Sequence, residues 1–266
     1  MPHLQLKDRT VLAVTGPDRQ HFLQGMLTND IGLVKNNALL YACFLSPQGK
    51  FLTDVFLQAQ SNNWGDDTWL LDVEADYAKT FMQQLNMFKL RANVQIVPTD
   101  LAVWVGWPYD CDAPPNTYPD PRLAALGWRA IGGNFEANTD SESYHTHHIA
   151  LGVPCGARDL KRGLTALLEA GLDKFNAISF TKGCYVGQEL TARMHYKSLA
   201  KKALLPVRYD GQILERGAAV RNQMGVAVGE VASAVPGLAL AYLKLDALSD
   251  VLMVDNIQIE LSNKNV

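Results

Sequence analysis

One stretch of the chain, residues 178–193, combines a cysteine with glycines and with charged and amide side chains. Its central part reads KGCYVGQE from Lys182 to Glu189. Gly183 and Gly187 lack a Cβ atom, so the backbone on either side of Cys184 can turn sharply and can let a planar ligand come close. The sequence thus predicts a turn that presents Cys184 as a candidate reactive thiol.

The side chains around this thiol suit nucleophilic chemistry and ligand recognition. If the turn folds back, Lys182 and Arg193 place positive charge near the sulfur, which favours the thiolate. Gln188 and Glu189 offer an amide and a carboxylate, which can pair with the donor and acceptor edge of a heterocycle. A structural interpretation stands beside this one, with Cys184 as a small buried residue, the two cations as a solvated face and Glu189 as a helix N-cap neighbour. The residue pattern alone leaves both interpretations open.

Two other patterns bear on metal binding. Residues 145–148 read HTHH, and histidines two apart on a strand can share one metal ion. A polar loop emerging from residues 138–143 explains this run equally well, and no acid or thiol nearby completes the set. The four cysteines, Cys43, Cys111, Cys155 and Cys184, are too far apart for the short spacings of zinc or cluster motifs. No metal site is therefore predicted within the chain, although a cluster bridged between two chains through Cys184 stays open.

Regular elements have to position the cysteine stretch. Alternation predicts a strand at 10–15, and the segments 38–44, 51–59 and 68–73 also look like strands, with a hairpin turn at 46–49. Helical spacing predicts helices that begin near residues 17 and 74, and a third helix over 157–170 that ends at Gly171. Beyond residue 201, five short strands separated by turn residues are typical of a small β-barrel.

The composition limits the classes of function. The chain has 266 residues, of which 48% are hydrophobic, enough for a sizeable core. Its 24 Lys and Arg against 27 Asp and Glu give a net charge of -3, so direct nucleic-acid binding is not expected. The longest apolar stretch, near 238–245, is too short for a membrane span. The first residues show no export signal or presequence, which predicts a cytoplasmic protein.

The KGCYVGQE run also resembles the K-G-C-[FY]-x-G-Q-E signature of the YgfZ family, a highly specific motif. The resemblance extends to residues 16–30, which contain Thr28-Asn29-Asp30, to the turn at residues 45–50, and to the strands of the C-terminal region. It covers essentially the whole chain. On these residues the chain is similar to the YgfZ branch of the glycine-cleavage T-protein superfamily.

The resemblance implies an α+β fold, a T-protein-like multi-domain ring with a C-terminal β-barrel. Residues 1–200 would form the aminomethyltransferase-like folate-binding region of two intertwined subdomains, and residues 201–266 the barrel. It implies tetrahydrofolate or a derivative as the cofactor, held in a central channel. The implied function is iron-sulfur cluster assembly or repair, which indirectly supports tRNA-modifying iron-sulfur enzymes. The expected partners are folate and iron-sulfur client or assembly proteins.

Carried over residue by residue, the resemblance gives Cys184 the role of the reactive thiol, with Lys182 beside it. The positions it implies for folate binding are Asn29, Asp30, Glu169, Tyr185, Gly187, Gln188, Glu189 and Arg193. T-proteins carry two adjacent acidic residues where this chain has Thr53 and Asp54, so one candidate acid for amine transfer is missing. Active aminomethyl transfer is therefore not predicted, and folate-dependent one-carbon transfer to a small amine is the alternative function.

Overall fold

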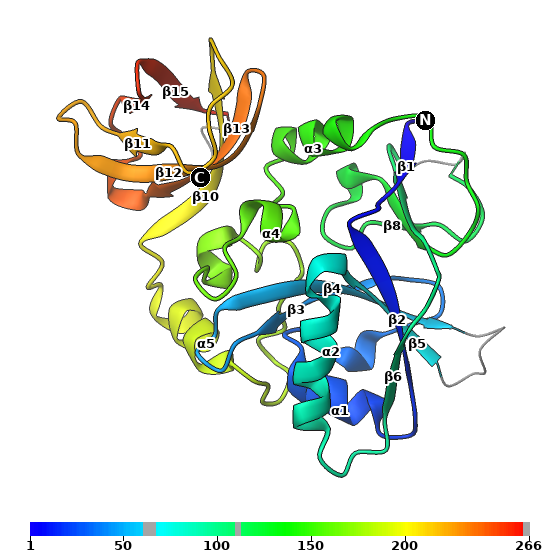
Figure 1. Ribbon diagram of the computed structural model, residues 1–266. Helices are drawn as coiled ribbons and strands as arrows, with labels where there is room; N and C mark the ends of the chain where they lie inside the picture. Colours follow the sequence, from blue (N-terminus) through cyan, green and yellow to red (C-terminus); the bar gives the residue numbers. More distant parts are fainter. Residues whose placement is uncertain (61–67, 110–112, 263–266) are drawn as a thin grey trace.

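A computed structural model of the chain describes residues 1–60, 68–109 and 113–262. The described residues form a five-stranded sheet, a four-stranded sheet and a closed barrel. Figure 1 shows the barrel at one end of the molecule, while the two sheets and most of the helices lie at the other. Helices and sheets are thus mixed along the chain, and a β-barrel ends it, as the predicted α+β class requires.

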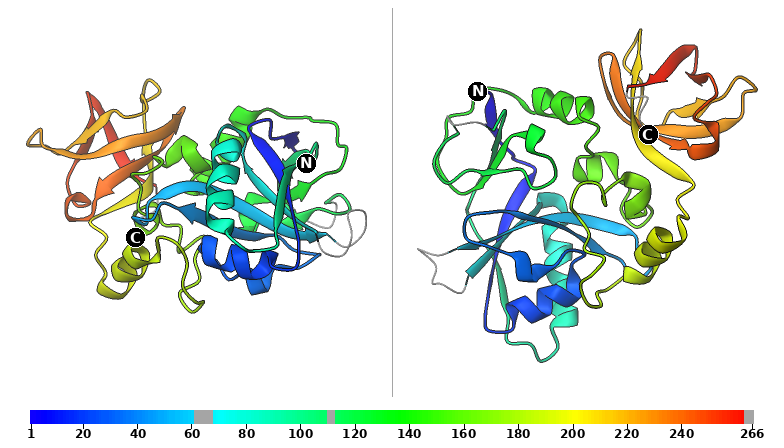
Figure 2. Two further views of the ribbon diagram at one scale, coloured as in Figure 1. Left: turned by 60° about the horizontal axis from the view of Figure 1, so that its bottom comes forward. Right: turned by 180° about the vertical axis from the view of Figure 1, so that it is seen from behind.

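The five-stranded sheet is antiparallel throughout. Its order is β3 (Leu40–Leu45), β4 (Phe51–Gln60), β5 (Thr68–Glu74), β2 (Arg9–Thr15) and β6 (Gln95–Pro98). Two helices, α1 (Arg19–Met26) and α2 (Ala75–Lys89), lie against it (Figures 1 and 2). The strands and helices predicted for this region, and the hairpin turn between β3 and β4, are confirmed.

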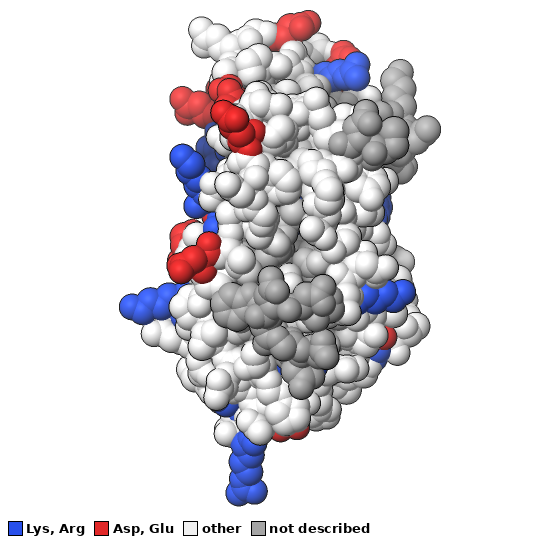
Figure 3. All heavy atoms as spheres, turned by 90° about the vertical axis from the view of Figure 1, so that its right-hand side faces the viewer, with Lys and Arg blue, Asp and Glu red and all other residues white. Residues whose placement is uncertain are grey.

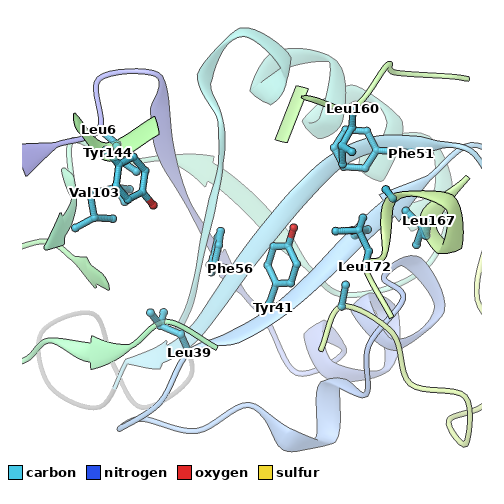
Figure 4. Close-up of a cluster of buried hydrophobic side chains, with 14 of the residues drawn as sticks. Leu6, Leu39, Tyr41, Phe51, Phe56, Val103, Tyr144, Leu160, Leu167 and Leu172 are labelled. Carbon is cyan, nitrogen blue, oxygen red and sulfur yellow. The ribbon is translucent and has the colours of Figure 1, made fainter. Parts of the chain in front are cut away.

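Alternate residues of these strands face two separate cores, because successive side chains of a strand point to opposite faces. Leu12 of β2 packs in the core that also contains Phe81 of α2. Its neighbour Val11 belongs to a second core on the other face of the sheet. Figure 4 shows part of this second core, in which Tyr41 and Phe56 of the sheet lie among side chains from later segments of the chain. The sheet is therefore buried on both faces.

The helix predicted over residues 157–170 is wrong. The segment forms a short helix α4 (Gly156–Asp159) and a 3-10 turn η3 (Leu167–Ala170). Between them Gly163 has a φ of +74° and donates its N–H to the carbonyl oxygen of Phe51 at 2.8 Å. The chain turns at Gly163 and bonds to the start of β4, so the helical spacing of the leucines does not produce a continuous helix. Leu160 and Leu167 are buried, whereas Leu164 is exposed.

The four-stranded sheet has the order β1 (His3–Gln5), β7 (Val103–Gly106), β9 (Trp128–Ile131) and β8 (Tyr118–Pro119). A 3-10 turn η2 (Ala124–Leu126) precedes β9, and helix α3 (Ser141–Ala150) follows it. The histidines at 145, 147 and 148 therefore lie on a helix and not on a strand. On the face of the molecule shown in Figure 3, the charged side chains of the described residues lie mainly along the edges.

The barrel closes in the order β10 (Lys202–Tyr209), β13 (Leu238–Lys244), β12 (Ala227–Val235), β11 (Ala219–Arg221), β14 (Leu252–Val254) and β15 (Ile257–Leu261), which pairs back with β10. A 3-10 turn, η4 (Leu245–Ala247), follows β13. The sequence analysis missed β14, a three-residue strand. Closure leaves no free sheet edge and encloses a third core. Among the described residues, no helix has the length and apolar character needed to cross a membrane.

Candidate functional site

The loop of residues 179–187, here called the signature loop, lies between the end of α1 and the turn that joins β3 to β4. It leads into helix α5 (Gln188–Lys197). Its backbone is tied to α1 and to the residues after it: Val186 donates its N–H to the carbonyl oxygen of Gly25 at 3.0 Å, and Ser179 donates to that of Thr28 at 3.1 Å. The loop is therefore held at both ends.

Lys182 fixes the signature loop on the C-terminal end of α1. Its Nζ donates to the carbonyl oxygens of Gln24, Leu27 and Asn29, each at 2.7 Å. These three contacts use every hydrogen of the ammonium group, and a helix C-terminus is a favourable place for positive charge. Burial lowers the pKa of Lys182 to about 8, so the group still carries its proton at neutral pH. Its hydrogen bonds thus serve the loop.

Gly187 holds the other end of the loop against the hairpin turn. Its φ is +81°, and a Cβ atom there would lie 2.4 Å from the carbonyl oxygen of Ser46 and 3.1 Å from the Cα of Gly49. Gly187 is also the N-cap residue of α5. The next residue, Gln188, accepts the N–H of Tyr185 through its Oε1 at 3.1 Å. Only glycine fits this contact without strain.

Cys184 is exposed at the surface of the signature loop. Its neighbour Gly183 has no atom within 4 Å of the place where a Cβ would stand. By contrast, Cys43 is buried in the sheet and Cys155 is half-buried, and burial raises the pKa of the Cys155 thiol to about 12. The interpretation of Cys184 as a buried apolar residue is therefore wrong. The loop presents its thiol to solvent.

Asn29 and Asp30, which the resemblance placed at the folate site, form hydrogen bonds with the nearby backbone. The buried Asn29 donates its side-chain amide to the carbonyl oxygens of Tyr41 and Asn176, both at 2.8 Å, and its Oδ1 accepts the N–H of Asp30 at 2.8 Å. Asp30 in turn accepts the N–H of Gly32 at 3.0 Å and caps the 3-10 turn η1 (Ile31–Leu33). Both side chains thus have partners within the chain.

The remaining residues predicted for folate are spread over a wider area. Tyr185 lies beside Lys182, whose Nζ is 5.1 Å from the centroid of its ring. Glu189 and Arg193 are exposed on α5. Glu169 lies at the junction with the barrel, where Oε2 is 3.7 Å from Nζ of Lys202. The structure brings most of the predicted residues to the signature loop and α5, and Glu169 lies on η3, which contacts α5.

A cavity of about 580 Å³ lies elsewhere, between the two sheets, and none of the ten predicted site residues lines it. Its lining includes Arg9, Asp54, Glu74, Arg122, Arg129 and Tyr144. It also includes His145 of α3, whose pKa is lowered to about 4 chiefly by burial. The described residues contain no group of three or more potential metal ligands. The cavity is thus a polar site that the sequence analysis did not find.

Buried ion pairs form the deep wall of this cavity. Arg9 donates from Nη1 to Asp54 at 2.5 Å and from Nε to Asp72 at 2.6 Å. Asp72 also accepts the Nε of Arg129 at 2.7 Å. Burial alone would raise the pKa of Asp54, but the Arg9 guanidinium holds it below its ordinary value. The carboxylate of Asp54 is therefore ionised.

Glu74, the last residue of β5, provides a second carboxylate beside Asp54. Its Oε2 accepts the hydroxyl of Thr53 at 3.1 Å and Nη2 of Arg162 at 2.7 Å, and its Oε1 accepts the N–H of Ala157 at 2.5 Å. Burial and the charge of Asp54 raise its pKa. Glu74 thus contacts Thr53 and lies beside Asp54. The register of β4 on β5, which pairs Val55 with Val73 in the neighbouring position, produces this proximity, and no sequence pattern signalled it.

Comparisons with known proteins agree with this fold. Residues 201–265 match the family model described as CAF17, C-terminal beta-barrel domain. The crystal structure of glycine cleavage system aminomethyltransferase T from Bartonella henselae aligns with a TM-score of 0.78, covering 99% of this chain and 85% of that chain at 13% identity. At this low identity the likeness concerns the fold alone. It confirms the predicted T-protein-like architecture.

Curated relatives show the family. The human protein named iron-sulfur cluster assembly factor IBA57, mitochondrial, is 33% identical over 90% of this chain and 76% of its own length. The mouse protein of the same name is 30% identical over 97% of this chain and 81% of its own length. The homologue from Mycosarcoma maydis is 34% identical over 76% of this chain, but only 55% of its own length is covered.

These relatives correct two predictions. All three are named mitochondrial, so the predicted cytoplasmic location is contradicted, and the features of the first residues were not sufficient grounds for it. The YgfZ family is close but is not the exact family. The chain belongs to the IBA57 family of iron-sulfur cluster assembly factors.

Proposed function

We propose that this protein assists the assembly of iron-sulfur clusters and that Cys184 is the side chain by which it contacts a cluster. One observation carries the proposal: an exposed thiol stands on a loop whose neighbouring residues are fixed to α1 and to the hairpin turn. Thiolates are the usual protein ligands of such clusters. The names of the human and mouse relatives support the same role.

The cluster in this proposal is shared with a second protein. A cluster of this type takes four protein ligands, and the described part of the chain contains no group of three or more side chains placed to bind a metal. Cys43 is buried and Cys155 is half-buried, so neither accompanies Cys184 at the surface. Cys111 lies outside the described residues. In this proposal Cys184 supplies one ligand, and the partner protein supplies the others.

The surface next to Cys184 suits an anionic partner. Arg193, Lys197 and Lys201 are exposed, and none forms an ion pair with another residue that the structure describes. Since α5 has ten residues, these cations begin within about 15 Å of the loop. A cluster held by thiolates carries net negative charge, which such cations would stabilise.

The test is a Cys184→Ala variant with Cys155→Ala as the matched control. Each is expressed in a strain that lacks its own assembly factor of this family, and the activity of iron-sulfur enzymes is measured. We expect Cys155→Ala to restore activity and Cys184→Ala to fail, although circular dichroism shows both folded. Full restoration by Cys184→Ala would remove the thiol from the mechanism.

Anaerobic reconstitution with iron and sulfide tests the shared cluster directly. We expect less than one cluster for each chain when the protein is alone, and loss of the bound iron in Cys184→Ala. A full cluster in the isolated monomer of Cys184→Ala would contradict the proposal.

We also propose that the protein binds tetrahydrofolate or a derivative, as the YgfZ resemblance implies. The supporting observation is the cavity of about 580 Å³, which falls in the range of sites for small molecules. Titration with tetrahydrofolate and with folinic acid tests this proposal, and the lack of any saturable signal would end it. Indirect support of tRNA-modifying iron-sulfur enzymes stays a further proposal, which the same strain tests through its modified tRNA.

One-carbon transfer to a small amine is the second candidate function, and Glu74 is the observation that favours it. Glu74 and Asp54 line the same cavity with pKa values shifted in opposite directions, an arrangement typical of acid and base pairs. We expect turnover of methylenetetrahydrofolate with an amine donor to fall at least tenfold in Glu74→Gln if this function exists. No turnover by the unmodified protein would exclude it.

A further inference from the structure

The deep wall of the cavity contains hydrogen-bond donors that the described chain does not use. Arg129 is only 2% exposed and donates through Nε to Asp72, while its Nη1 and Nη2 have no hydrogen-bond partner among the described residues. Its guanidinium carbon lies 3.8 Å from the centroid of the Phe56 ring. Arg122, 3% exposed, donates through Nε and Nη2 to Asp120 at 2.9 and 2.7 Å, and its Nη1 has no such partner within the same residues.

The carboxylates of this wall are better satisfied than the guanidinium groups. Asp54 accepts from Arg9 through Oδ1 and from the Tyr41 hydroxyl through Oδ2, at 2.5 and 3.3 Å. Both oxygens of Glu74 accept the hydrogen bonds described above. Each carboxylate oxygen thus has a donor, whereas three guanidinium nitrogens have no acceptor in the described chain. These nitrogens belong to residues that line the cavity, so they can donate to the acceptors of a ligand that enters it.

The mouth of the cavity adds a further cation. Arg158 lines it and is exposed, and its side chain forms no hydrogen bond or ion pair with the residues that the structure describes. Two exposed carboxylates, Asp8 and Asp140, line the mouth as well. Asp140 is engaged as the N-cap of α3, where it accepts the N–H of Ser143 at 2.8 Å. The guanidinium of Arg158 can therefore meet a ligand.

Apolar side chains form the rest of the lining. Leu4, Leu6, Phe56 and Trp104 belong to it, and they provide flat and aliphatic surface for the body of an organic molecule. The volume of about 580 Å³ exceeds what an isolated oxyanion fills and suits a molecule of moderate size.

We infer that this cavity is a binding site for a small organic anion, whose carboxylate or phosphate group is held by Arg129 and Arg122, with Arg158 at the mouth. Guanidinium groups form paired, charge-assisted hydrogen bonds with both kinds of oxyanion. The inference is independent of the role of Cys184. It also goes beyond the folate proposal, because a ligand without a pterin ring satisfies it.

The test uses the full chain, isothermal titration calorimetry and two probes, inorganic phosphate and citrate. The variants are Arg158→Gln and Arg129→Lys, and the matched control is Arg91→Gln, an exposed arginine just after α2 and outside the cavity. We expect saturable binding of at least one probe, weakened about tenfold or more by Arg129→Lys and about threefold to tenfold by Arg158→Gln. Arg91→Gln should bind as the unmodified protein does.

The probe that binds shows which oxyanion the site accepts, which is phosphate, carboxylate or both. Arg158→Gln keeps the test valid if Arg129→Lys does not fold, because the Arg158 side chain has no partner in the described structure. Lack of binding by both probes overturns the inference, as does equal binding by Arg158→Gln and the unmodified protein.

Folinic acid separates this inference from the folate proposal. Binding of citrate without binding of folinic acid ends the folate proposal and supports the anion site. Binding of folinic acid that neither anion inhibits, with neither anion bound alone, overturns the anion site and leaves the folate proposal standing.

Discussion

Replacing Gly187 by alanine tests whether the signature loop is held as the structure indicates. The φ of +81° at this residue costs an alanine about 1–2 kcal/mol. The new Cβ would lie 2.4 Å from the carbonyl oxygen of Ser46 and 3.0 Å from the Cβ of Leu45, and overpacking of this kind costs about 1–3 kcal/mol. We therefore expect Gly187→Ala to lower the free energy of unfolding by about 2–5 kcal/mol.

Gly183 provides the matched control, because it lies in the same loop, has no positive φ, and has no atom within 4 Å of the place that a Cβ would occupy. We expect Gly183→Ala to change the free energy of unfolding by less than about 0.5 kcal/mol. Urea denaturation followed by circular dichroism measures both variants. The rate at which iodoacetamide alkylates Cys184 is a measure of the conformation of the signature loop. This rate should change in Gly187→Ala but not in Gly183→Ala.

Equal stability of the two alanine variants would refute this reasoning. It would mean that the loop does not press Gly187 against the hairpin turn in solution, and that Cys184 is not held in a defined position. The proposed contact with a cluster would then need another explanation for its geometry.

Three further predictions concern the thiols and the lysine. Iodoacetamide at pH 8 should alkylate Cys184 well before Cys43 and Cys155, and peptide mass spectrometry would show the order. Lys182→Met should cost about 1–3 kcal/mol of unfolding free energy because three carbonyl groups lose their donor, whereas the exposed Lys197→Met should stay within about 0.5 kcal/mol. Burial raises the pKa of Cys43 and Cys155 above 9.0, so the unfolded chain releases these protons first. The free energy of unfolding should therefore fall above about pH 9, by at most about 1.4 kcal/mol per pH unit for each thiol. Deprotonation of Lys182 by itself raises the free energy of unfolding between about pH 8 and the ordinary pKa of lysine, because the folded chain loses this proton first. A free energy of unfolding that stays constant up to about pH 11 would contradict this prediction.

The fold was predictable where local pattern and burial agree. Strands β3 and β4 consist mostly of apolar residues, as expected for strands buried on both faces, and their turn contains Pro47 and Gly49. The segment 157–170 fails for a nonlocal reason, because Gly163 bonds to β4 across the chain. Strand β14 is only three residues long, so the barrel partners on either side define it more than its own sequence does.

The cavity was hidden from sequence analysis because its residues meet only through tertiary contacts. Arg9, Arg129 and Asp72 come from three strands in two different sheets. Glu74 faces Asp54 only through the register of β5 on β4, and no pattern within either strand specifies that register. The sequence shows that position 53 lacks an acid, but it does not show which acid lies next to that position in space.

Within the KGCYVGQE run, the structure distinguishes residues that hold the loop from the exposed side chains of Cys184 and Glu189. Lys182 caps α1, Gly187 fits against the hairpin turn, and Gln188 bonds back to Tyr185. Cys184 makes none of these contacts and is exposed. The anchored loop therefore leaves the Cys184 thiol free for contacts outside the chain, whereas the ammonium group of Lys182 is used within it. This difference is why the proposed function depends on the thiol and not on the lysine.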